Sequence, residues 1–500
     1  MPRARSLCLF AVLFFTGSIF WAQAPSASQV TIDAHAQVTP FPHFWEKMFG
    51  SGRAILSLRD SYRRDLRSVH QITGFEYVRF HAIFHDEVGV YDEDAIGNPV
   101  YNFSYVDQIY DGLLENGVKP FVELSFTPRK LAGPNPVFHS FWYKPISSPP
   151  QDMAKWDDLI YNFTRHLVDR YGLDEVSQWY FEVWNEPNID FWAGEPKQQT
   201  YFELYDHTVR AIKRVSPRLR VGGPATAQAA WADAMIQHAV TAKVPLDFLS
   251  SHVYGNDTAE NVFHTNENIP RDQMVCRAVR HVHDQIKASA MPNLPLIWSE
   301  FNASYMNEVP VTDSTYMGPW MADTIRQCDG LVDILSYWTF SDVFEEQGVV
   351  KTPFYGGFGL IAEDGIPKAS FSAFRLLHRL GDERIKSDAS DVLITKRKDG
   401  TLVVAAWNLV PPGQTGPSKT LAFELKGRAA KRALVSRVDA NHGDTLTAFE
   451  KMGSPKYPSK QQIEELQKVA QEVPAEAVSI REGKFSVTIP SSGLALIEIR

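Results

Sequence analysis

The chain has 500 residues, of which 44% are hydrophobic and 22% are charged, with a formal net charge of −9 at pH 7. These proportions are close to those of soluble globular proteins, and they exclude a mostly disordered chain and an integral membrane protein. The length favours a large domain with a smaller partner domain, and the negative charge argues against nucleic acid and anionic membranes as partners.

The N-terminus has the pattern of a secretory signal peptide. Arg3 and Arg5 precede an apolar stretch over residues 7–21, and residues 22–24 form an Ala-Gln-Ala cleavage site. The apolar stretch is shorter than the roughly 20 residues that span a bilayer. We therefore expect residues 1–24 to be removed, which leaves a secreted or periplasmic protein without a membrane span. Loss of the two arginines takes the net charge from −9 to −11.

From residue 47 onwards, short β-rich runs alternate with longer runs of helical period. The predicted strands cover residues 47–53, 76–83, 119–126, 178–184, 219–223, 247–253, 295–301 and 333–340. Repeated βα units of this kind predict an α/β fold, a closed (β/α)8 TIM barrel over residues 41–380. A doubly wound open sheet is the alternative, but the Gly-rich phosphate turn that would support it does not follow the first strand.

The pattern changes after a predicted helix at 370–380. Residues 381–500 contain β-rich runs without intervening helices, which predicts a β-sandwich accessory domain with one surface helix at 461–471. An early strand within residues 25–40 precedes the barrel, and we expect it to pair with the C-terminal sheet. Cys276 and Cys328 are too few for a disulfide scaffold and are interpreted as ordinary buried residues. Because both fall on predicted helices that are neighbours in the barrel, one disulfide is the alternative in an exported protein.

Two of the predicted barrel strands end in a glutamate. Glu186 follows a buried run and precedes Pro187, and Glu300 stands near the end of the seventh strand. Barrel active sites lie at the C-terminal ends of strands, so barrel closure would bring the two together. Two carboxylates across a cleft, one protonated and one ionised, can hydrolyse a glycosidic bond without a metal or cofactor. A helix-capping or salt-bridged carboxylate is the structural alternative for Glu186.

The strings around these glutamates resemble a known family. Residues 184–187 (Trp-Asn-Glu-Pro) and 298–301 (Trp-Ser-Glu-Phe) are similar to the retaining barrel glycosidases, and more narrowly to glycoside hydrolase family 39, the β-xylosidases and α-L-iduronidases. The resemblance implies that Glu186 is the general acid/base and Glu300 the nucleophile of a double displacement. That mechanism requires a carboxylate separation of about 5 to 5.5 Å, whereas inversion requires about 6.5 to 9.5 Å.

The same resemblance suggests six substrate-binding residues. They are Asn185, His252, Tyr254, Trp338, Glu346 and His81. We expect Asn185 to donate a hydrogen bond to the sugar 2-hydroxyl. Strand alternation places His252 and Tyr254 on one face, from which His252 could bind a sugar hydroxyl and Tyr254 could hydrogen-bond Glu300.

The strand-eight residues supply the remaining sugar contacts. Trp338 would form an apolar platform under the sugar ring, and Glu346 would accept hydrogen bonds from ring hydroxyls. His81 on the second strand could also reach the sugar. A plain core residue is the alternative for Trp338, His81, His252 and Tyr254, and a turn cap for Asn185.

These features predict a β-xylosidase that releases terminal xylose from xylo-oligosaccharides or other xylosides. An α-L-iduronidase is an alternative, and it would need a cation for the substrate carboxylate, for which Arg129 and Lys130 are candidates. An endo-glycanase and a catalytically silent carbohydrate-binding barrel are further alternatives. The expected partner is a carbohydrate, and the sequence also allows an oligomer.

Overall fold

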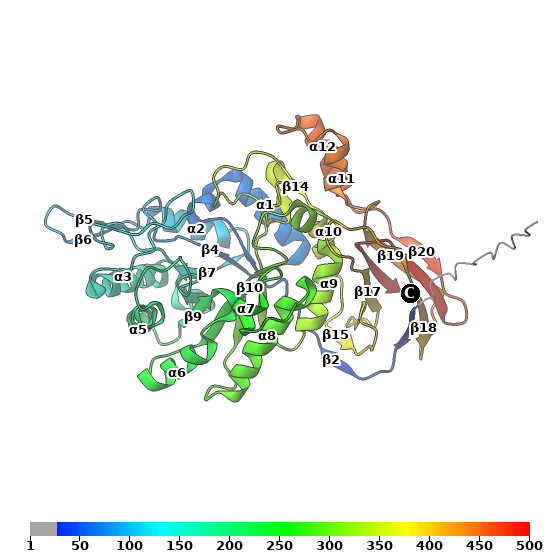
Figure 1. Ribbon diagram of the computed structural model, residues 1–500, viewed down its shortest axis with the longest axis horizontal. Helices are drawn as coiled ribbons and strands as arrows, with labels where there is room; N and C mark the ends of the chain where they lie inside the picture. The colour runs from blue at the N-terminus through cyan, green and yellow to red at the C-terminus, as the bar shows by residue number, and fades with distance from the viewer. Residues whose placement is uncertain (1–27) are drawn as a thin grey trace, which may run out of the picture.

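The computed structural model describes residues 28–500, so the predicted signal peptide at 1–24 lies outside the described residues. Eight parallel strands close into a barrel in the order β3, β4, β7, β8, β9, β10, β11, β12 (Figure 1). The strands are β3 (Met48–Gly50), β4 (Tyr77–Phe80), β7 (Lys119–Leu124), β8 (Tyr180–Val183), β9 (Arg220–Thr226), β10 (Phe248–Tyr254), β11 (Leu296–Asn302) and β12 (Ile334–Tyr337). The predicted fold class is confirmed, and each predicted strand overlaps one of these.

Eight long helices surround the barrel, one after each strand. They are α1 (Asp60–Thr73), α2 (Ser104–Leu114), α3 (Met153–Tyr171), α5 (Lys197–Val215), α6 (Ala232–Ala242), α8 (Arg271–Ala288), α9 (Met317–Cys328) and α10 (Ala369–Leu377). Local sequence sets their ends: the Asp152 side chain accepts from the backbone N–H groups of Ala154 and Lys155 at the start of α3, and Gly172 follows its last residue.

Strand alternation divides the barrel interior into layers. The lowest layer is apolar and contains Met48, Tyr77, Phe121, Phe248, Ile297 and Ile334, which form one buried cluster. Two residues further along β4, β7 and β8, the same face carries Arg79, Glu123 and Glu182. The polar layer therefore lies above an apolar floor, toward the C-terminal ends of the strands.

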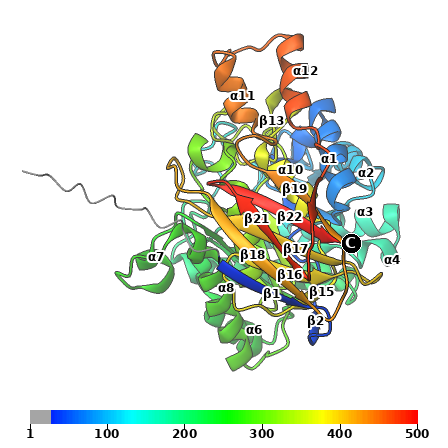
Figure 2. The same cartoon turned by 90° about the vertical axis from the view of Figure 1, so that its right-hand side faces the viewer.

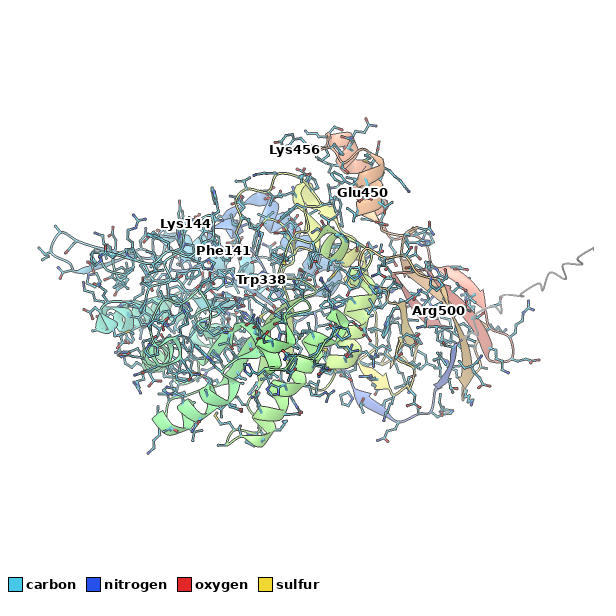
Figure 3. The ribbon with its side chains drawn as sticks, in the orientation of Figure 1. Phe141, Lys144, Trp338, Glu450, Lys456 and Arg500 are labelled. Atoms are coloured by element: carbon cyan, nitrogen blue, oxygen red, sulfur yellow. A yellow bond between two sulfur atoms is a disulfide. The ribbon has the colours of Figure 1, made fainter. Side chains whose placement is uncertain are left out.

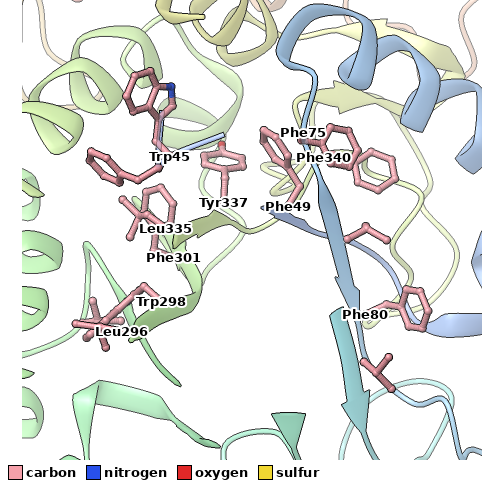
Figure 4. Packing of buried hydrophobic residues seen from close by; sticks show 14 of the residues in the cluster. Trp45, Phe49, Phe75, Phe80, Leu296, Trp298, Phe301, Leu335, Tyr337 and Phe340 are labelled. Carbon is pink, nitrogen blue, oxygen red and sulfur yellow. The ribbon is translucent and has the colours of Figure 1, made fainter. Parts of the chain in front are cut away.

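The other face of the strands packs against the helices. Phe49, Trp298 and Leu335 belong to the large core cluster there, together with Phe301 and Tyr337 (Figure 4). These side chains are fully buried. The outer faces of the strands are consequently mostly apolar, which holds the polar inner face in a fixed position.

The C-terminal part consists of two sheets with a shared core (Figure 2). One has seven strands in the order β2, β15, β16, β17, β22, β19, β20, and the other has three in the order β1, β18, β21. Their bounds are β1 (Ser28–Asp33), β2 (Val38–Pro40), β15 (Glu383–Ile385), β16 (Val392–Lys396), β17 (Leu402–Asn408), β18 (Lys419–Lys426), β19 (Arg432–Val438), β20 (Glu476–Ser479), β21 (Lys484–Ile489) and β22 (Gly493–Ile499). Strand β1 pairs in parallel with β18, so the N-terminal segment is part of the sandwich.

Two helices project from this sandwich, α11 (Thr445–Lys451) and α12 (Lys460–Val469), where the sequence predicted one (Figure 1). A capping box of Ser459 and Gln462 starts α12. Phe449 of α11 and Leu466 of α12 share an apolar cluster with Phe354 from the loop after β12. This insertion therefore packs against the barrel segment that follows the last barrel strand.

A disulfide joins Cys276 on α8 to Cys328 on α9. The two helices follow neighbouring strands of the barrel, β10 and β11, and they pack side by side. Within residues 28–500, the structure contains no helix that is both long enough and apolar enough to cross a membrane.

Candidate active site

A cavity of about 570 Å³ opens at the C-terminal ends of the barrel strands. This volume is within the range of small-molecule binding sites. Seven of the eight predicted site residues line it: His81, Asn185, Glu186, Tyr254, Glu300, Trp338 and Glu346. The structure thus brings together residues from five different strands or the loops after them.

The two predicted catalytic carboxylates face each other across this cavity. A carboxylate oxygen of Glu186 and one of Glu300 lie within 4.8 Å of each other. This spacing fits the short separation of retaining enzymes, about 5 to 5.5 Å, and is too short for the water that an inverting enzyme places between its carboxylates.

Glu186 stands at a strained turn directly after β8. Its φ of 43° and the φ of 71° at Trp184 are both in the left-handed region, which residues other than glycine rarely adopt. The indole N–H of Trp184 donates to the Phe191 carbonyl at 3.0 Å, and the Glu186 N–H donates to the Ala225 carbonyl at 2.9 Å. These two bonds fix the turn that carries the Glu186 side chain.

The surroundings of Glu186 keep its carboxyl group protonated. Burial raises the pKa of Glu186 well above its ordinary value of 4.5, and the negative charge of Glu300 raises it further. Burial likewise lowers the pKa of His252 well below 6.5, so this imidazole is neutral. Glu186 is therefore the member of the pair that can donate a proton at neutral pH.

A chain of hydrogen bonds assigns the tautomer of His252. The Ser299 hydroxyl donates to Glu182 at 2.7 Å, so it accepts from His252 Nε2 at 3.0 Å. The unprotonated Nδ1 then accepts the proton of Glu186 across 3.0 Å. The side chain of His252 is fully buried and is absent from the cavity lining, and both of its ring nitrogens have partners, so the structure shows it in contact with Glu186 rather than facing the space for a sugar.

Glu300 has a partner for each of its oxygens. Arg79 Nη1 donates to Oε1 at 2.6 Å, and the Tyr254 hydroxyl donates to Oε2 at 2.7 Å, which is the contact that the sequence predicted. Burial and the charge of Glu300 raise the pKa of Tyr254 well above 10, so the phenol remains a donor. An arginine and a phenol donor both stabilise an ionised carboxylate, the form that a nucleophile needs.

Arg79 organises the polar layer, and the sequence reasoning missed it. Its side chain is fully buried and contacts Glu182 at 2.6 Å and Glu123 at 2.8 Å in addition to Glu300. It also donates to Asn185 Oδ1 at 2.9 Å. Since arginine only donates, this bond directs the Asn185 amide nitrogen away from Arg79 and leaves it free to donate to a substrate. The signal in the sequence was a charged residue inside the second strand, two residues before His81 and so on the same face.

His81, Trp338 and Glu346 form the other wall. His81 Nδ1 bonds Glu123 at 2.6 Å, while Nε2 lies 3.7 Å from Glu346 and 3.8 Å from Glu300. Burial raises the pKa of Glu346 well above 4.5, so its carboxyl group can donate as well as accept a hydrogen bond. The three side chains present a ring and two polar groups to the cavity.

Trp338 owes its position to a glycine. A Cβ atom at Gly50 would lie 2.0 Å from Cε3 of the indole, so only glycine allows the ring to lie over β3. The indole packs with Tyr254, Phe344 and Phe358 in a small apolar cluster. The ring is thereby held in place as part of the wall that it forms with His81 and Glu346.

The two cations suggested for a uronic acid are outside the cavity. The side chain of Arg129 is 70% exposed and pairs with Asp86 at 3.5 Å, and Lys130 is exposed beside it. Among the described residues that line the cavity there is neither lysine nor arginine. The alternative reading of Arg129 and Lys130 as a solvated loop pair agrees with these positions.

Comparison with known proteins identifies the family. The model of "Glycosyl hydrolases family 39" matches residues 28–484. A β-xylosidase of Geobacillus stearothermophilus is 37% identical over 476 residues, 92% of this chain and 93% of the relative. A β-xylosidase of Caldicellulosiruptor saccharolyticus is 38% identical over 467 residues, 90% of this chain and 93% of the relative.

A solved structure agrees with this similarity over nearly the whole chain. The crystal structure of a monomeric β-xylosidase from Caulobacter crescentus CB15 has a TM-score of 0.85 and 35% identity, and the match covers 95% of this chain and 99% of that one. With the family match over residues 28–484, the resemblance read from the two glutamate strings is confirmed: the chain belongs to glycoside hydrolase family 39, a family of retaining glycosidases that hydrolyse O-glycosyl bonds.

Proposed function

We propose that this protein is a retaining β-xylosidase that releases terminal xylose, with Glu300 as nucleophile and Glu186 as general acid/base. The observation that carries the assignment of roles is the contrast between the two carboxylates. Glu186 is buried against a neutral imidazole, whereas Glu300 is held by the Arg79 guanidinium and the Tyr254 hydroxyl. The two relatives that match over most of their length are β-xylosidases, which supports xylose as the sugar.

The geometry suits a double displacement. Glu300 attacks the anomeric carbon while Glu186 gives its proton to the leaving oxygen, and a covalent xylosyl-enzyme forms. Esterification removes the negative charge of Glu300, which lowers the pKa of Glu186 and prepares it to accept a proton from water in the second step. Asn185, oriented by Arg79, donates to the 2-hydroxyl, a bond that strengthens in the oxocarbenium-like transition state.

The carboxyl groups that line the cavity, and the lack of a lysine or arginine among the described lining residues, support a neutral sugar. Its lining carries the acidic residues Glu186, Asp190, Asp257, Glu300 and Glu346. A uronic acid would bring a further carboxylate into this group without a cation among the described lining residues to pair with it. We therefore place xylosides before iduronides.

The loops support removal of terminal residues. The backbone N–H of Trp142, in the loop after β7, donates to the carbonyl of Glu346, in the loop after β12, at 2.8 Å. Behind this bridge the Arg53 guanidinium lies 4.7 Å from the Tyr143 ring centroid and 3.3 Å from Glu345. These contacts join the two loops over one side of the cavity, which supports action at the end of a sugar chain.

The test is hydrolysis of p-nitrophenyl β-D-xyloside by the wild type and by Glu300→Gly and Glu186→Ala. We expect Glu300→Gly to lose turnover, whereas Glu186→Ala keeps more activity on this activated leaving group than on an alkyl xyloside. A 2-fluoro xyloside with a good leaving group should add one fluoroxylosyl mass to the peptide that contains Glu300. An inactive wild type, or a label on another residue, would contradict the proposal.

We also propose that the protein acts outside the cytoplasm. The predicted signal peptide and the disulfide between Cys276 and Cys328 support this proposal, because disulfides persist in oxidising compartments. Fractionation of the native host, with mass determination of the mature N-terminus, tests it. A protein that retains residues 1–24 in the cytoplasm would contradict it.

A further inference from the structure

The active-site cavity has a polar inner half and an apolar outer half. The inner half, around Trp338, presents His81, Asn185 and Glu346 to the sugar. The outer half is lined mainly by rings and apolar side chains, with four polar residues between them. The rings and apolar side chains are those of Phe141, Ile189, Phe191, Ala227, Tyr305 and His139, and the polar residues are Ser140, Asp190, Gln228 and Asp257. Figure 3 labels one residue of each half, Phe141 of the outer half and Trp338 of the inner half.

The outer half is where the leaving group must lie. Glu186 protonates the leaving oxygen, so the group attached to that oxygen sits next to Glu186. Ile189 and Phe191 belong to the same loop as Glu186, and Ala227 belongs to the neighbouring loop, which the bond from Glu186 N–H to Ala225 ties to it. These apolar residues therefore lie on the side of the leaving group, and Phe191, whose ring centroid is 6.2 Å from that of His81, stands where the two halves meet.

Three rings build a continuous wall on this side. The His139 ring stacks on Phe191 with centroids 4.1 Å apart and an angle of 17° between the planes. Phe141 meets Phe191 edge to face at 5.3 Å and His139 at 4.3 Å. Phe191 is 8% exposed and Phe141 is half-buried, so the wall is held from behind and open toward the cavity.

The two carboxylates of the outer half already have protein partners. Asp257 accepts from the Tyr254 N–H at 2.7 Å and from Gln228 Nε2 at 3.4 Å. The Asp190 side chain is 70% exposed and points its carboxylate to His139 Nε2 at 3.4 Å. A sugar could stack on these rings as on Trp338, but its hydroxyl groups would lose hydrogen bonds with water unless protein partners replaced them, whereas an alkyl or aryl group carries no such cost.

The apolar surface continues onto the rim. Tyr305 and Met306, in the loop after β11, are 50% and 53% exposed. Apolar surface of this kind next to a binding cavity is stabilised when an apolar ligand covers it. Since the polar sugar occupies the inner half, the covering group is the aglycone.

We infer that the preferred substrates are β-xylosides of an apolar alcohol or phenol rather than xylo-oligosaccharides. This inference rests on the proposed xylosidase function and specifies the leaving group. The outer wall selects by burial of apolar area, so affinity for the transition state should rise with the apolar size of the aglycone.

The test is kcat/KM for methyl, propyl and hexyl β-D-xylosides and for xylobiose. The alkyl series keeps leaving-group acidity nearly constant while apolar area grows. We expect a gain of up to about fourfold per buried methylene, and we expect hexyl xyloside to exceed xylobiose. A flat series, or xylobiose as the best substrate, would overturn the inference. Absence of turnover on every xyloside, p-nitrophenyl xyloside included, would instead reject the proposed function itself.

Two variants of one loop localise the effect. Phe141→Ala removes part of the wall, so the gain with chain length should shrink. Phe138→Ala is the matched control, because Phe138 is 48% exposed, three residues away in the same loop, and outside the cavity lining. The control should keep the wild-type slope, and an equal loss of slope in both variants would place the apolar contact elsewhere. Circular dichroism of the control, and its turnover of methyl xyloside, show whether the control is folded.

Discussion

The repulsion between the two catalytic carboxylates sets the pH at which the acid is lost, and removal of Glu300 tests this directly. Two unit charges no more than 4.8 Å apart repel by at least about 3.5 kcal/mol at an effective dielectric constant of about 20. This repulsion disfavours the ionised form of Glu186 and is one cause of its raised pKa, after burial. The variant Glu300→Gly removes the charge while it leaves Glu186 in place.

The direction in which the pH profile of the variant shifts follows from the role of Glu186 as the acid. Activity that needs the protonated carboxyl is present below its pKa and is lost as the pH rises through it. Because the variant lacks the neighbouring charge, the pKa of Glu186 falls, and the loss occurs at lower pH than in the wild type.

The assay is hydrolysis of phenyl β-D-xyloside, with azide supplied as an external nucleophile for Glu300→Gly. The rate is followed against pH, and the basic limb of the profile is compared with that of the wild type. Asp190→Asn, which neutralises an exposed carboxylate at the cavity mouth, is the control and should leave the limb in place. A limb that stays fixed or moves to higher pH in Glu300→Gly would refute the assignment of Glu300 as the charge that raises the pKa of Glu186.

Three further results are expected. The double variant Cys276→Ser/Cys328→Ser should unfold in urea with a free energy lower by about 4 kcal/mol, because the disulfide closes a loop over a sequence separation of 52 residues, while activity at 25 °C persists. Gly50→Ala should lower kcat/KM by about 10- to 100-fold, as expected when a binding contact worth about 1 to 3 kcal/mol is displaced, since its Cβ would collide with the Trp338 indole. Unchanged circular dichroism would separate this effect from misfolding, and wild-type kinetics would contradict it. A chelator should leave xyloside turnover unchanged, since the two-carboxylate mechanism uses no metal, and loss of turnover on dialysis against EDTA would oppose that mechanism.

The barrel was predictable because its signals are repeated. Each strand appears in the sequence as a short apolar run. Each is followed by a segment in which apolar residues recur at helical spacing, as they do in α3. The first helix of the insertion, α11, was missed because it has only seven residues, too few for a helical period to be recognised. The Cys276–Cys328 pairing stayed open in the sequence because distance between two helices is a tertiary property.

The catalytic pair was predictable for a different reason, since Glu186 and Glu300 stand at strand ends that closure must bring together. The neighbouring residues that give the two carboxylates different roles were harder to predict. Arg79 follows the same alternation as His81, but a single buried charge could pair with any of several carboxylates, and only the folded barrel places Glu123, Glu182 and Glu300 around it.

His252 marks the limit of strand alternation as evidence for function. The pattern correctly puts His252 and Tyr254 on one face of β10, yet one contacts Glu186 from behind and the other reaches Glu300 from the cavity. Successive inward positions along a barrel strand lie in different layers, because residues two apart are roughly 6.5 Å apart along the strand and, with its tilt, roughly 5 Å apart in depth. At the upper layer a side chain meets substrate, and one layer below it meets the catalytic groups themselves. A polar residue two positions before a strand-end residue is therefore better interpreted as a partner of the catalytic group than as a sugar ligand.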